Sequence, residues 1–140
     1  MGEVIIVGVD RSETAARAAQ AAARLAVGLG WPLHVVTAYE DEETVQIEVG
    51  SDVFMVTSFD SAEGVAKSVA TALARPGLEV TSGAAVGKPQ DVLIEEAERL
   101  DAALIVVGNR RMQGPGRLLG SIANSIAHHA PCAVYIAKTT

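Results

Sequence analysis

The residues best suited to chemistry lie between positions 105 and 121, where an apolar run passes into a basic segment rich in glycine. Its glycines are Gly108, Gly114, Gly116 and Gly120, the last of which precedes Ser121 at the start of a predicted helix. Glycine leaves backbone N–H groups accessible, and a helix N-terminus stabilises a bound anion through its open N–H groups and its dipole. The segment therefore predicts a phosphate-binding loop.

Positive charge is concentrated in the same segment. Arg110, Arg111 and Arg117 are three of the 11 basic residues in a chain of net charge −6, and no carboxylate lies between Gly108 and Gly120. A polyphosphate is attracted to such a local excess of positive charge. The alternative is that these arginines pair with carboxylates of a dimer partner or keep an exposed loop in solution.

A second candidate is the turn after the apolar run Val4–Val9. Gly8 lies within the end of this run and Asp10 follows it, two residues before Ser12. Asp and Ser are both residue types that cap a helix N-terminus, so Asp10 has a structural role as an N-cap that requires no ligand. A ligand role for Asp10 is compatible with this one.

Strand and helix patterns alternate along the chain and predict how these two loops are positioned. Apolar β-branched runs predict strands at 4–9, 33–37, 78–86, 103–107 and 133–137, and helical periodicity and caps predict helices at 13–29, 61–74, 89–99 and 121–129. Residues 44–57 form either a small hairpin or an irregular excursion. The acidic run 40–43 is expected to be a solvated loop.

This alternation predicts a single α/β domain over residues 1–140, with a doubly wound, Rossmann-like sheet of five parallel strands and helices on both faces. Ligands of such sheets bind beyond the carboxyl ends of the strands, near the point where the strand order reverses. The loops that contain Asp10 and Gly108 both follow strands, so they should face one crevice.

Other phosphate motifs and hydrolytic signatures do not fit the chain. Residues 83–88 resemble a P-loop but are one residue short between the glycines, and Pro89 stands where a Ser or Thr is required. Gly114-Pro-Gly116 lacks the third glycine of a dinucleotide fingerprint. Cys-x-x-Cys, His-Glu-x-x-His and Gly-x-Ser-x-Gly are absent from the sequence. We predict no catalytic residue and no metal ligand.

Five segments together closely resemble the universal stress protein family over nearly the whole chain. They are Val7-Gly-Val-Asp-Arg-Ser12, Leu33-His-Val-Val36, Ala103–Gly108, Leu119-Gly-Ser-Ile122 and His128-His-Ala-Pro-Cys132. The resemblance implies the family fold of five parallel strands and a homodimer formed through the last strand, residues 133–137. It also implies a nucleotide site like that of the ATP-binding subgroup.

By this resemblance the nucleotide site comprises Gly8, Val9, Asp10, Val35, Val107, Gly108, Arg110, Arg111, Gly120, Ser121 and Ile122. Asp10 would contact the ribose or adenine region of the nucleotide. Val35 would be either an ordinary core residue or a wall beside the adenine. Ser121 would cap the last helix and also donate to phosphate.

The chain departs from the subgroup in two places. ATP-binding members have a loop of Gly, two residues, Gly, nine residues, Gly and then Ser or Thr. Arg111 stands where the second glycine is expected, and the span from Gly108 to Gly120 is one residue short. Arginine brings bulk to a crowded position, but its guanidinium can also grip a phosphate in bidentate fashion.

The expected function is that of a nucleotide-binding stress-response or regulatory protein, with ATP as its ligand, with or without Mg²⁺, and at most slow ATP hydrolysis. One alternative is a cyclic AMP-binding protein. Another is a dimeric interaction module in which Arg111 and the shortened loop have disabled the site. The acidic charge argues against nucleic acid or anionic membranes as partners, and the sequence shows neither a spanning apolar run nor a signal-peptide pattern. We therefore expect a cytoplasmic protein.

Overall fold

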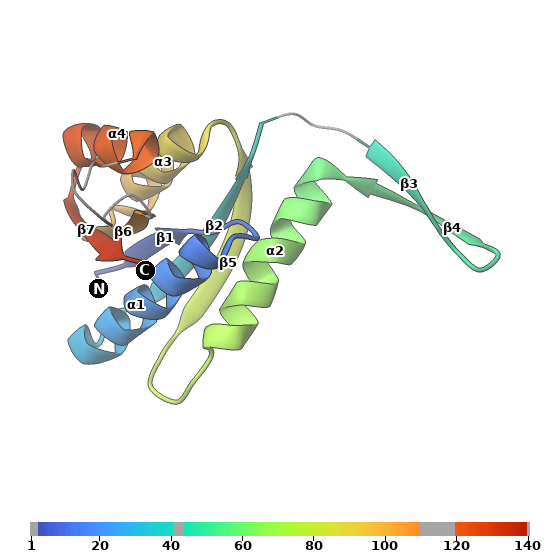
Figure 1. Ribbon diagram of the computed structural model, residues 1–140. Helices are drawn as coiled ribbons and strands as arrows, with labels where there is room; N and C mark the ends of the chain where they lie inside the picture. The colour runs from blue at the N-terminus through green and yellow to red at the C-terminus, as the bar shows by residue number, and fades with distance from the viewer. Residues whose placement is uncertain (1–2, 41–43, 110–119, 140) are drawn as a thin grey trace.

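The computed structural model describes residues 3–40, 44–109 and 120–139 (Figure 1). The strands of this part are β1 (Ile5–Gly8), β2 (Leu33–Tyr39), β3 (Thr44–Val49), β4 (Asp52–Thr57), β5 (Val80–Val86), β6 (Leu104–Asn109) and β7 (Ala133–Lys138). The helices are α1 (Glu13–Leu29), α2 (Ser58–Leu73), α3 (Pro89–Leu100) and α4 (Ser121–His129).

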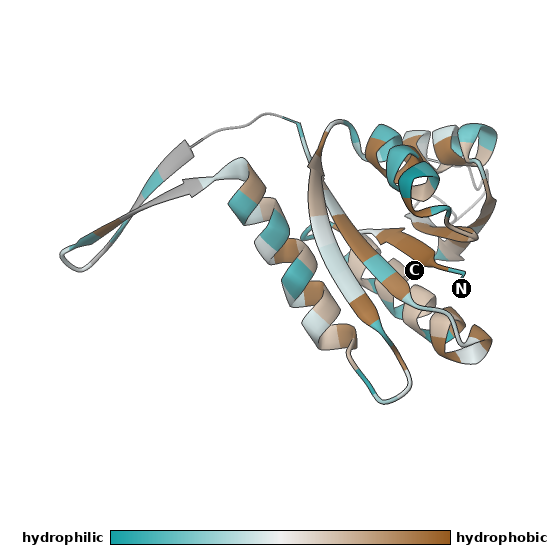
Figure 2. Cartoon of the chain, turned by 180° about the vertical axis from the view of Figure 1, so that it is seen from behind, coloured by the Kyte–Doolittle hydropathy of each residue, from teal (hydrophilic) through white to brown (hydrophobic). Residues whose placement is uncertain are grey.

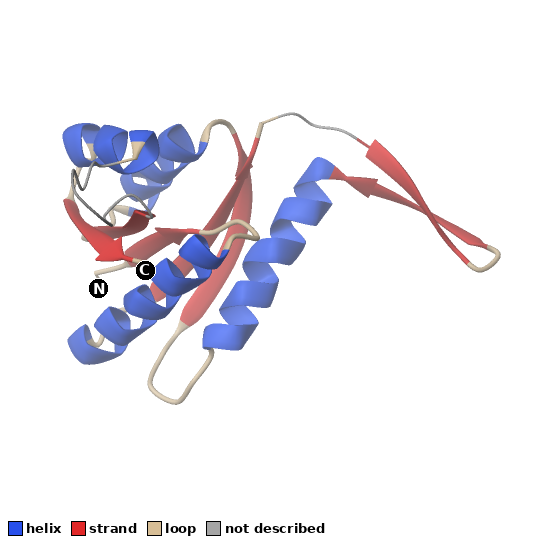
Figure 3. Ribbon diagram, viewed as in Figure 1, coloured by secondary structure: helices blue, strands red, loops and turns tan. Residues whose placement is uncertain are grey.

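Five of the strands form one parallel sheet in the order β5-β2-β1-β6-β7. The chain adds β2 on one side of β1 and later returns to add β6 on the other side, so the strand order reverses at β1. Helices α1 and α2 cover one face of the sheet, and α3 and α4 cover the other (Figure 3). The predicted doubly wound fold is confirmed.

The core is aliphatic and divides into two layers, one on each face of the sheet. Successive side chains of a strand point to opposite faces. On β2, Val35 is therefore buried against α1 and α2, whereas Val36 is buried against α3. All the buried residues of α1 are alanines, which allows this helix to lie close to the sheet. The apolar residues of the central strands lie between the helical layers in Figure 2.

Capping chemistry sets where α1 and α2 begin. The Ser12 hydroxyl is the N-cap of α1 and accepts from the N–H of Ala15 at 3.1 Å. Asp10, which we predicted as the N-cap, instead accepts from the N–H of Ser12 at 2.7 Å and so shapes the turn that precedes the helix. Helix α2 begins three residues before the predicted start at 61, because Thr57 and Asp60 form a capping box.

Residues 44–57 form a hairpin, the first of the two alternatives that the sequence allowed. Strands β3 and β4 pair in antiparallel fashion, and Val49 is opposite Asp52 across the two-residue turn Gly50-Ser51. Gly50 has φ of 63° at the first central position, which is where a type II′ turn requires glycine. The hairpin extends away from the main sheet beyond the start of α2 (Figure 1).

Candidate functional site

A cavity of about 370 Å³ lies at the carboxyl ends of β1 and β6. The first turns of α1, α3 and α4 close its sides. Its lining within the described residues is Gly8, Val9, Asp10, Ser12, Thr14, Ala15, Val36, Ala38, Pro89, Val92, Leu93, Val107, Gly108, Asn109, Gly120, Ser121, Ile122 and Ala123. The turn after β1 and the two ends of the 108–120 loop thus face one crevice, as predicted from the order of the elements.

Eight of the predicted site residues line this cavity: Gly8, Val9, Asp10, Val107, Gly108, Gly120, Ser121 and Ile122. Val35 does not line it, because the alternation of β2 turns its side chain into the core beneath α1 and α2. Its neighbour Val36 occupies the place on the cavity wall that we had considered for Val35. Arg110 and Arg111 lie outside the described residues.

The two strand-end glycines lie close to neighbouring elements, and only at Gly108 is the neighbour a backbone atom. A Cβ atom on Gly8 would lie 2.9 Å from Cδ1 of Leu93. A Cβ on Gly108 would lie 2.9 Å from Cγ2 of Thr139 and 3.1 Å from the backbone oxygen of Thr14. Gly108 therefore lets β6 pass close to the first turn of α1, which brings that turn to the edge of the cavity.

The N-terminus of α4 opens into the cavity. Its N-cap, Gly120, provides no side-chain hydrogen bond to the first turn, and the residues that follow, Ser121 and Ile122, line the cavity with their exposed side chains. The Asn109 side chain, only 3% exposed, accepts from the N–H of Gly120 through Oδ1 at 3.0 Å. Asn109 thus ties the end of β6 to the start of α4 and fixes where this helix points.

The opposite wall of the cavity is apolar. It is formed by Val36 and Ala38 of β2 and by Val92 and Leu93 of α3. These residues make a slot that suits a flat ring, while Asp10 and the α4 N-terminus offer polar groups beside it. A nucleotide has the matching division into an apolar base, a hydroxylated sugar and an anionic phosphate.

Several of the lining residues were missed from the sequence. They are Ser12, Thr14, Ala15, Val36, Ala38, Pro89, Val92, Leu93, Asn109 and Ala123. Asn109 carried a usable signal, since a polar amide at the carboxyl end of a buried strand is a natural site residue in this fold. Residues of α3 carried none, because their place beside β1 depends on how the helix crosses the sheet.

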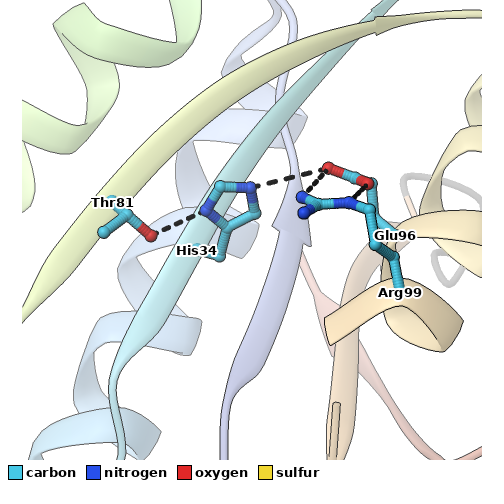
Figure 4. Close-up of polar contacts among 4 residues, drawn as sticks. All are labelled: His34, Thr81, Glu96 and Arg99. Atoms are coloured by element: carbon cyan, nitrogen blue, oxygen red, sulfur yellow. Dashed lines mark hydrogen bonds and ion pairs between the residues drawn. The ribbon is translucent and has the colours of Figure 1, made fainter. Parts of the chain in front are cut away.

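A polar cluster around the buried His34 lies between β2, β5 and α3 (Figure 4). Nδ1 of His34 lies 2.7 Å from Oγ1 of Thr81, and Nε2 lies 3.7 Å from Oε1 of Glu96. Arg99 donates to both carboxylate oxygens of Glu96 at 2.6 and 2.9 Å. Burial lowers the pKa of His34, and this effect outweighs the nearby Glu96 carboxylate, which raises it.

A second cavity, of about 290 Å³, lies on the other face of the sheet, between the end of β2 and the start of α2. It shares Asp10 and Ala38 with the first cavity. Thr37 lines it and is 6% exposed, and its hydroxyl has no hydrogen-bond partner among the described residues.

Within the described ranges, the structure contains no group of three or more His, Cys, Asp or Glu side chains that could hold a metal ion. In the same ranges, no helix is both long and apolar enough to cross a bilayer.

Comparison with known proteins places this geometry in a family. The sequence matches the Universal stress protein family over residues 1–138. The chain belongs to the universal stress protein family. The universal stress protein Rv1636 of Mycobacterium tuberculosis is 30% identical in an alignment 144 residues long. The alignment covers 99% of this chain and 97% of that protein. Matches to two other curated universal stress proteins span 36% and 51% of their length.

Solved universal stress protein structures share the fold. One, determined in complex with cAMP, has a TM-score of 0.71 and 27% identity, with 99% of this chain and 98% of that chain covered. A universal stress protein from Archaeoglobus fulgidus has a TM-score of 0.73 and 25% identity, with 97% and 98% covered. Another structure of an Archaeoglobus fulgidus universal stress protein, in complex with dAMP, has a TM-score of 0.70 and 24% identity, with 96% of both chains covered.

Proposed function

We propose that this universal stress protein binds an adenine nucleotide in the first cavity, with ATP as the leading candidate. The observation that carries the proposal is the division of one cavity into an apolar slot at Val36 and Leu93 and an uncapped helix N-terminus at Ser121. A phosphate bound at that N-terminus would be stabilised by open N–H groups and the helix dipole. Asp10 lies between these parts as a partner for ribose hydroxyls.

Backbone groups of β2 support recognition of the base. The N–H of Val9 donates to the carbonyl of Val36 at 2.8 Å, and the N–H of Gly87 donates to the carbonyl of Tyr39 at 2.8 Å. Alternate residues of a strand thus direct their backbone groups toward β1 and toward β5. The backbone N–H and C=O of Ala38 point toward β1, as those of Val36 do. However, β1 ends at Gly8, which is paired with Val36, so no residue of β1 is paired with Ala38. The N–H and C=O of Ala38 are therefore available to the donor and acceptor on the edge of an adenine ring.

The relative solved with cAMP supports cyclic AMP as a second candidate ligand. A cyclic nucleotide carries a single phosphate, so it depends less on the middle of the 108–120 loop than a triphosphate does. Competition between ATP and cyclic AMP for the same cavity would rank the two. In either case we propose a binding protein without rapid turnover.

Isothermal titration calorimetry with ATP and Mg²⁺, and separately with cyclic AMP, tests the proposal. Binding should weaken at least about tenfold in Ser121→Ala, which removes a charge-assisted hydrogen bond to phosphate worth about 1.5–3 kcal/mol. Ser125→Ala, one turn further along α4, is the matched control and should bind like the unaltered protein. The absence of heat with either nucleotide at millimolar concentration would refute nucleotide binding.

The role of Asp10 has its own variant. Asp10→Asn retains an oxygen that accepts from the N–H of Ser12, so the turn before α1 should remain intact. The loss of the carboxylate should weaken nucleotide binding, and should weaken it less for a nucleotide that lacks the 2′-hydroxyl. A ribose contact would be excluded if the nucleotides with and without the 2′-hydroxyl bound with equal affinity, both to the unaltered protein and to the Asp10→Asn variant.

We also propose a homodimer formed through β7, the edge strand next to β6. An edge strand presents unpaired backbone groups that another chain can complete. The side chain of Tyr135 is 46% exposed on this strand, which is unusual for a large ring without a binding partner.

A further inference from the structure

The hairpin β3–β4 is a sheet of its own. Its strands pair with each other and with no strand of the main sheet among the described residues. In Figure 1 it extends from the start of α2 into open space. An isolated two-stranded hairpin is at best marginally stable in water, and a third strand or a packed face stabilises it. The hairpin is therefore shaped as an incomplete sheet.

The register of the hairpin identifies the backbone groups that remain open. Across a two-residue turn the closing pair, Val49 and Asp52, exchanges both hydrogen bonds, and every second pair along the ladder does the same. The intervening pairs, such as Glu48 with Val53, direct their N–H and C=O groups outward. Each outer edge can therefore accept another strand.

Side-chain chemistry along the hairpin suits an apolar and cationic partner. Val45, Ile47 and Val49 alternate in sequence with the polar residues of β3. Val53 of β4 is 55% exposed, which is high for a valine. An apolar residue of a partner strand could pack against this exposed valine.

The charge of this region is entirely negative. Residues 40–63 contain no Lys, Arg or His, and their carboxylates are Glu40, Asp41, Glu42, Glu43, Glu48, Asp52, Asp60 and Glu63. This segment thus holds eight of the 17 carboxylates, more than the net charge of −6 of the whole chain. Such a field attracts cationic groups and repels nucleic acid, anionic lipid and a second copy of the same segment.

We propose that the hairpin is a docking arm that binds an extended, cationic polypeptide segment as a third β-strand. The outward backbone groups of β3 or β4 would pair with the segment. Lys or Arg side chains of the segment would meet Glu48 at the β3 edge or Asp52 at the β4 edge, since these two carboxylates belong to opposite faces of the hairpin. This mode of recognition uses main-chain hydrogen bonds for affinity and alternate side chains for specificity. It is independent of nucleotide binding, because among the hairpin residues whose side chains are described, none before Thr57 lines either cavity.

The full-length protein can be tested with a defined probe. The probe is a fluorescein-labelled peptide of ten residues that alternates Lys and Val, and the readout is fluorescence anisotropy at about 50 and about 200 mM NaCl. Two control peptides have the same length: one alternates Glu and Val, and one holds the Lys and Val residues in separate blocks. We expect binding of the alternating Lys–Val peptide, at least tenfold weaker binding of the block peptide, and a loss of affinity at the higher salt.

Variants locate the site on the hairpin. The double variant Glu48→Lys with Asp52→Lys should weaken binding at least tenfold. The matched control, Glu95→Lys with Glu98→Lys, makes the same charge change on exposed positions of α3 and should weaken it much less. Val53→Pro removes an outward N–H without removing a bond of the hairpin ladder, so it should abolish pairing at the β4 edge.

A peptide modification keeps the test valid if the proline variant perturbs the hairpin. N-methylation of alternate residues of the probe removes its N–H groups along one edge, and this should abolish binding to the unaltered protein. The proposal is overturned if no probe binds, if the block or N-methylated peptide binds as well as the original, or if both charge variants have equal effects. Binding of phosphatidylserine vesicles or RNA at the hairpin, or hairpin-dependent self-association in sedimentation, would also overturn it.

Discussion

His34 shows how burial sets the chemistry of one side chain. It is 9% exposed on β2, and its imidazole lies between Thr81 and Glu96. With hydrogen on Nε2, the ring directs its N–H toward the Glu96 carboxylate and leaves Nδ1 to accept from the Thr81 hydroxyl. The lowered pKa of His34 keeps the imidazole mainly neutral near pH 7.

This residue predicts a dependence of stability on pH. The pKa of His34 is lowered on folding from an ordinary value near 6.5, so below that pH the unfolded chain binds more protons than the folded one. The free energy of unfolding should therefore fall as the pH drops below about 6.5, by about 1.4 kcal/mol for each unit by which the pKa is lowered. Urea denaturation from pH 8 to 5 measures this.

The variant His34→Gln provides the control for that measurement. Glutamine does not titrate in this range, and His128 and His129 remain in the variant. The free energy of unfolding of the variant should therefore depend less on pH than that of the unaltered protein. Parallel profiles for the two proteins would contradict the assignment to His34.

The Arg99 guanidinium lowers the pKa of Glu96. The stability that this ion pair contributes should therefore be lost only at more acidic pH, near and below about 4.5.

The buried Thr37 and the exposed Thr81 should respond in opposite ways to replacement by valine. The Thr37 hydroxyl has no partner among the described residues, so Thr37→Val should raise the free energy of unfolding by about 1 kcal/mol. Thr81→Val removes the partner of His34 Nδ1 and should lower it by about 1–3 kcal/mol. Thermal and urea unfolding of both variants give the comparison. A destabilised Thr37→Val variant would instead indicate that the second cavity holds a bound partner for this hydroxyl.

At the scale of elements, the site depends on how closely β6 approaches α1. Gly108→Ala should destabilise the protein by about 1–3 kcal/mol, because its Cβ would meet the backbone oxygen of Thr14 as well as the side chain of Thr139. Gly64→Ala is the matched control, since a Cβ there meets nothing within 4 Å in the middle of α2. This second variant should stabilise the protein by about 0.5–1 kcal/mol. Similar stability of the two variants would contradict the close approach.

At the scale of the whole molecule, the two edges of the sheet should behave differently. Tyr135→Glu places a charge on the exposed face of β7 and should shift a β7-mediated dimer toward monomer, by at least tenfold in its dissociation constant. Val86→Glu places the same charge on β5, the opposite edge strand, where the side chain is 58% exposed, and should leave the dimer intact. Sedimentation velocity of the unaltered protein and both variants distinguishes the edges. A monomer of the unaltered protein at micromolar concentration would contradict the dimer itself.

The order of elements was predictable because each carries its own local signal. Apolar β-branched runs identified the five strands of the parallel sheet, and the residues around Gly30 and Pro89 identified helix boundaries. The choice between a hairpin and an irregular segment at 44–57 was not predictable, since alternation over so few residues fits both. Helix α2 begins at Ser58 and not at the predicted residue 61, because the capping box of Thr57 and Asp60 adds a turn before the apolar periodicity starts.

The sequence by itself determined the family, the doubly wound sheet and the two loops that face the crevice, because these follow from periodicity, turn residues and local motifs. Only the tertiary structure decided that Val36 rather than Val35 lines the cavity, since the face to which a strand residue points depends on which helices cover it. The structure alone also revealed the role of Asn109 and the approach of Thr139 to Gly108, because these contacts join segments that are distant along the chain or that only packing brings together.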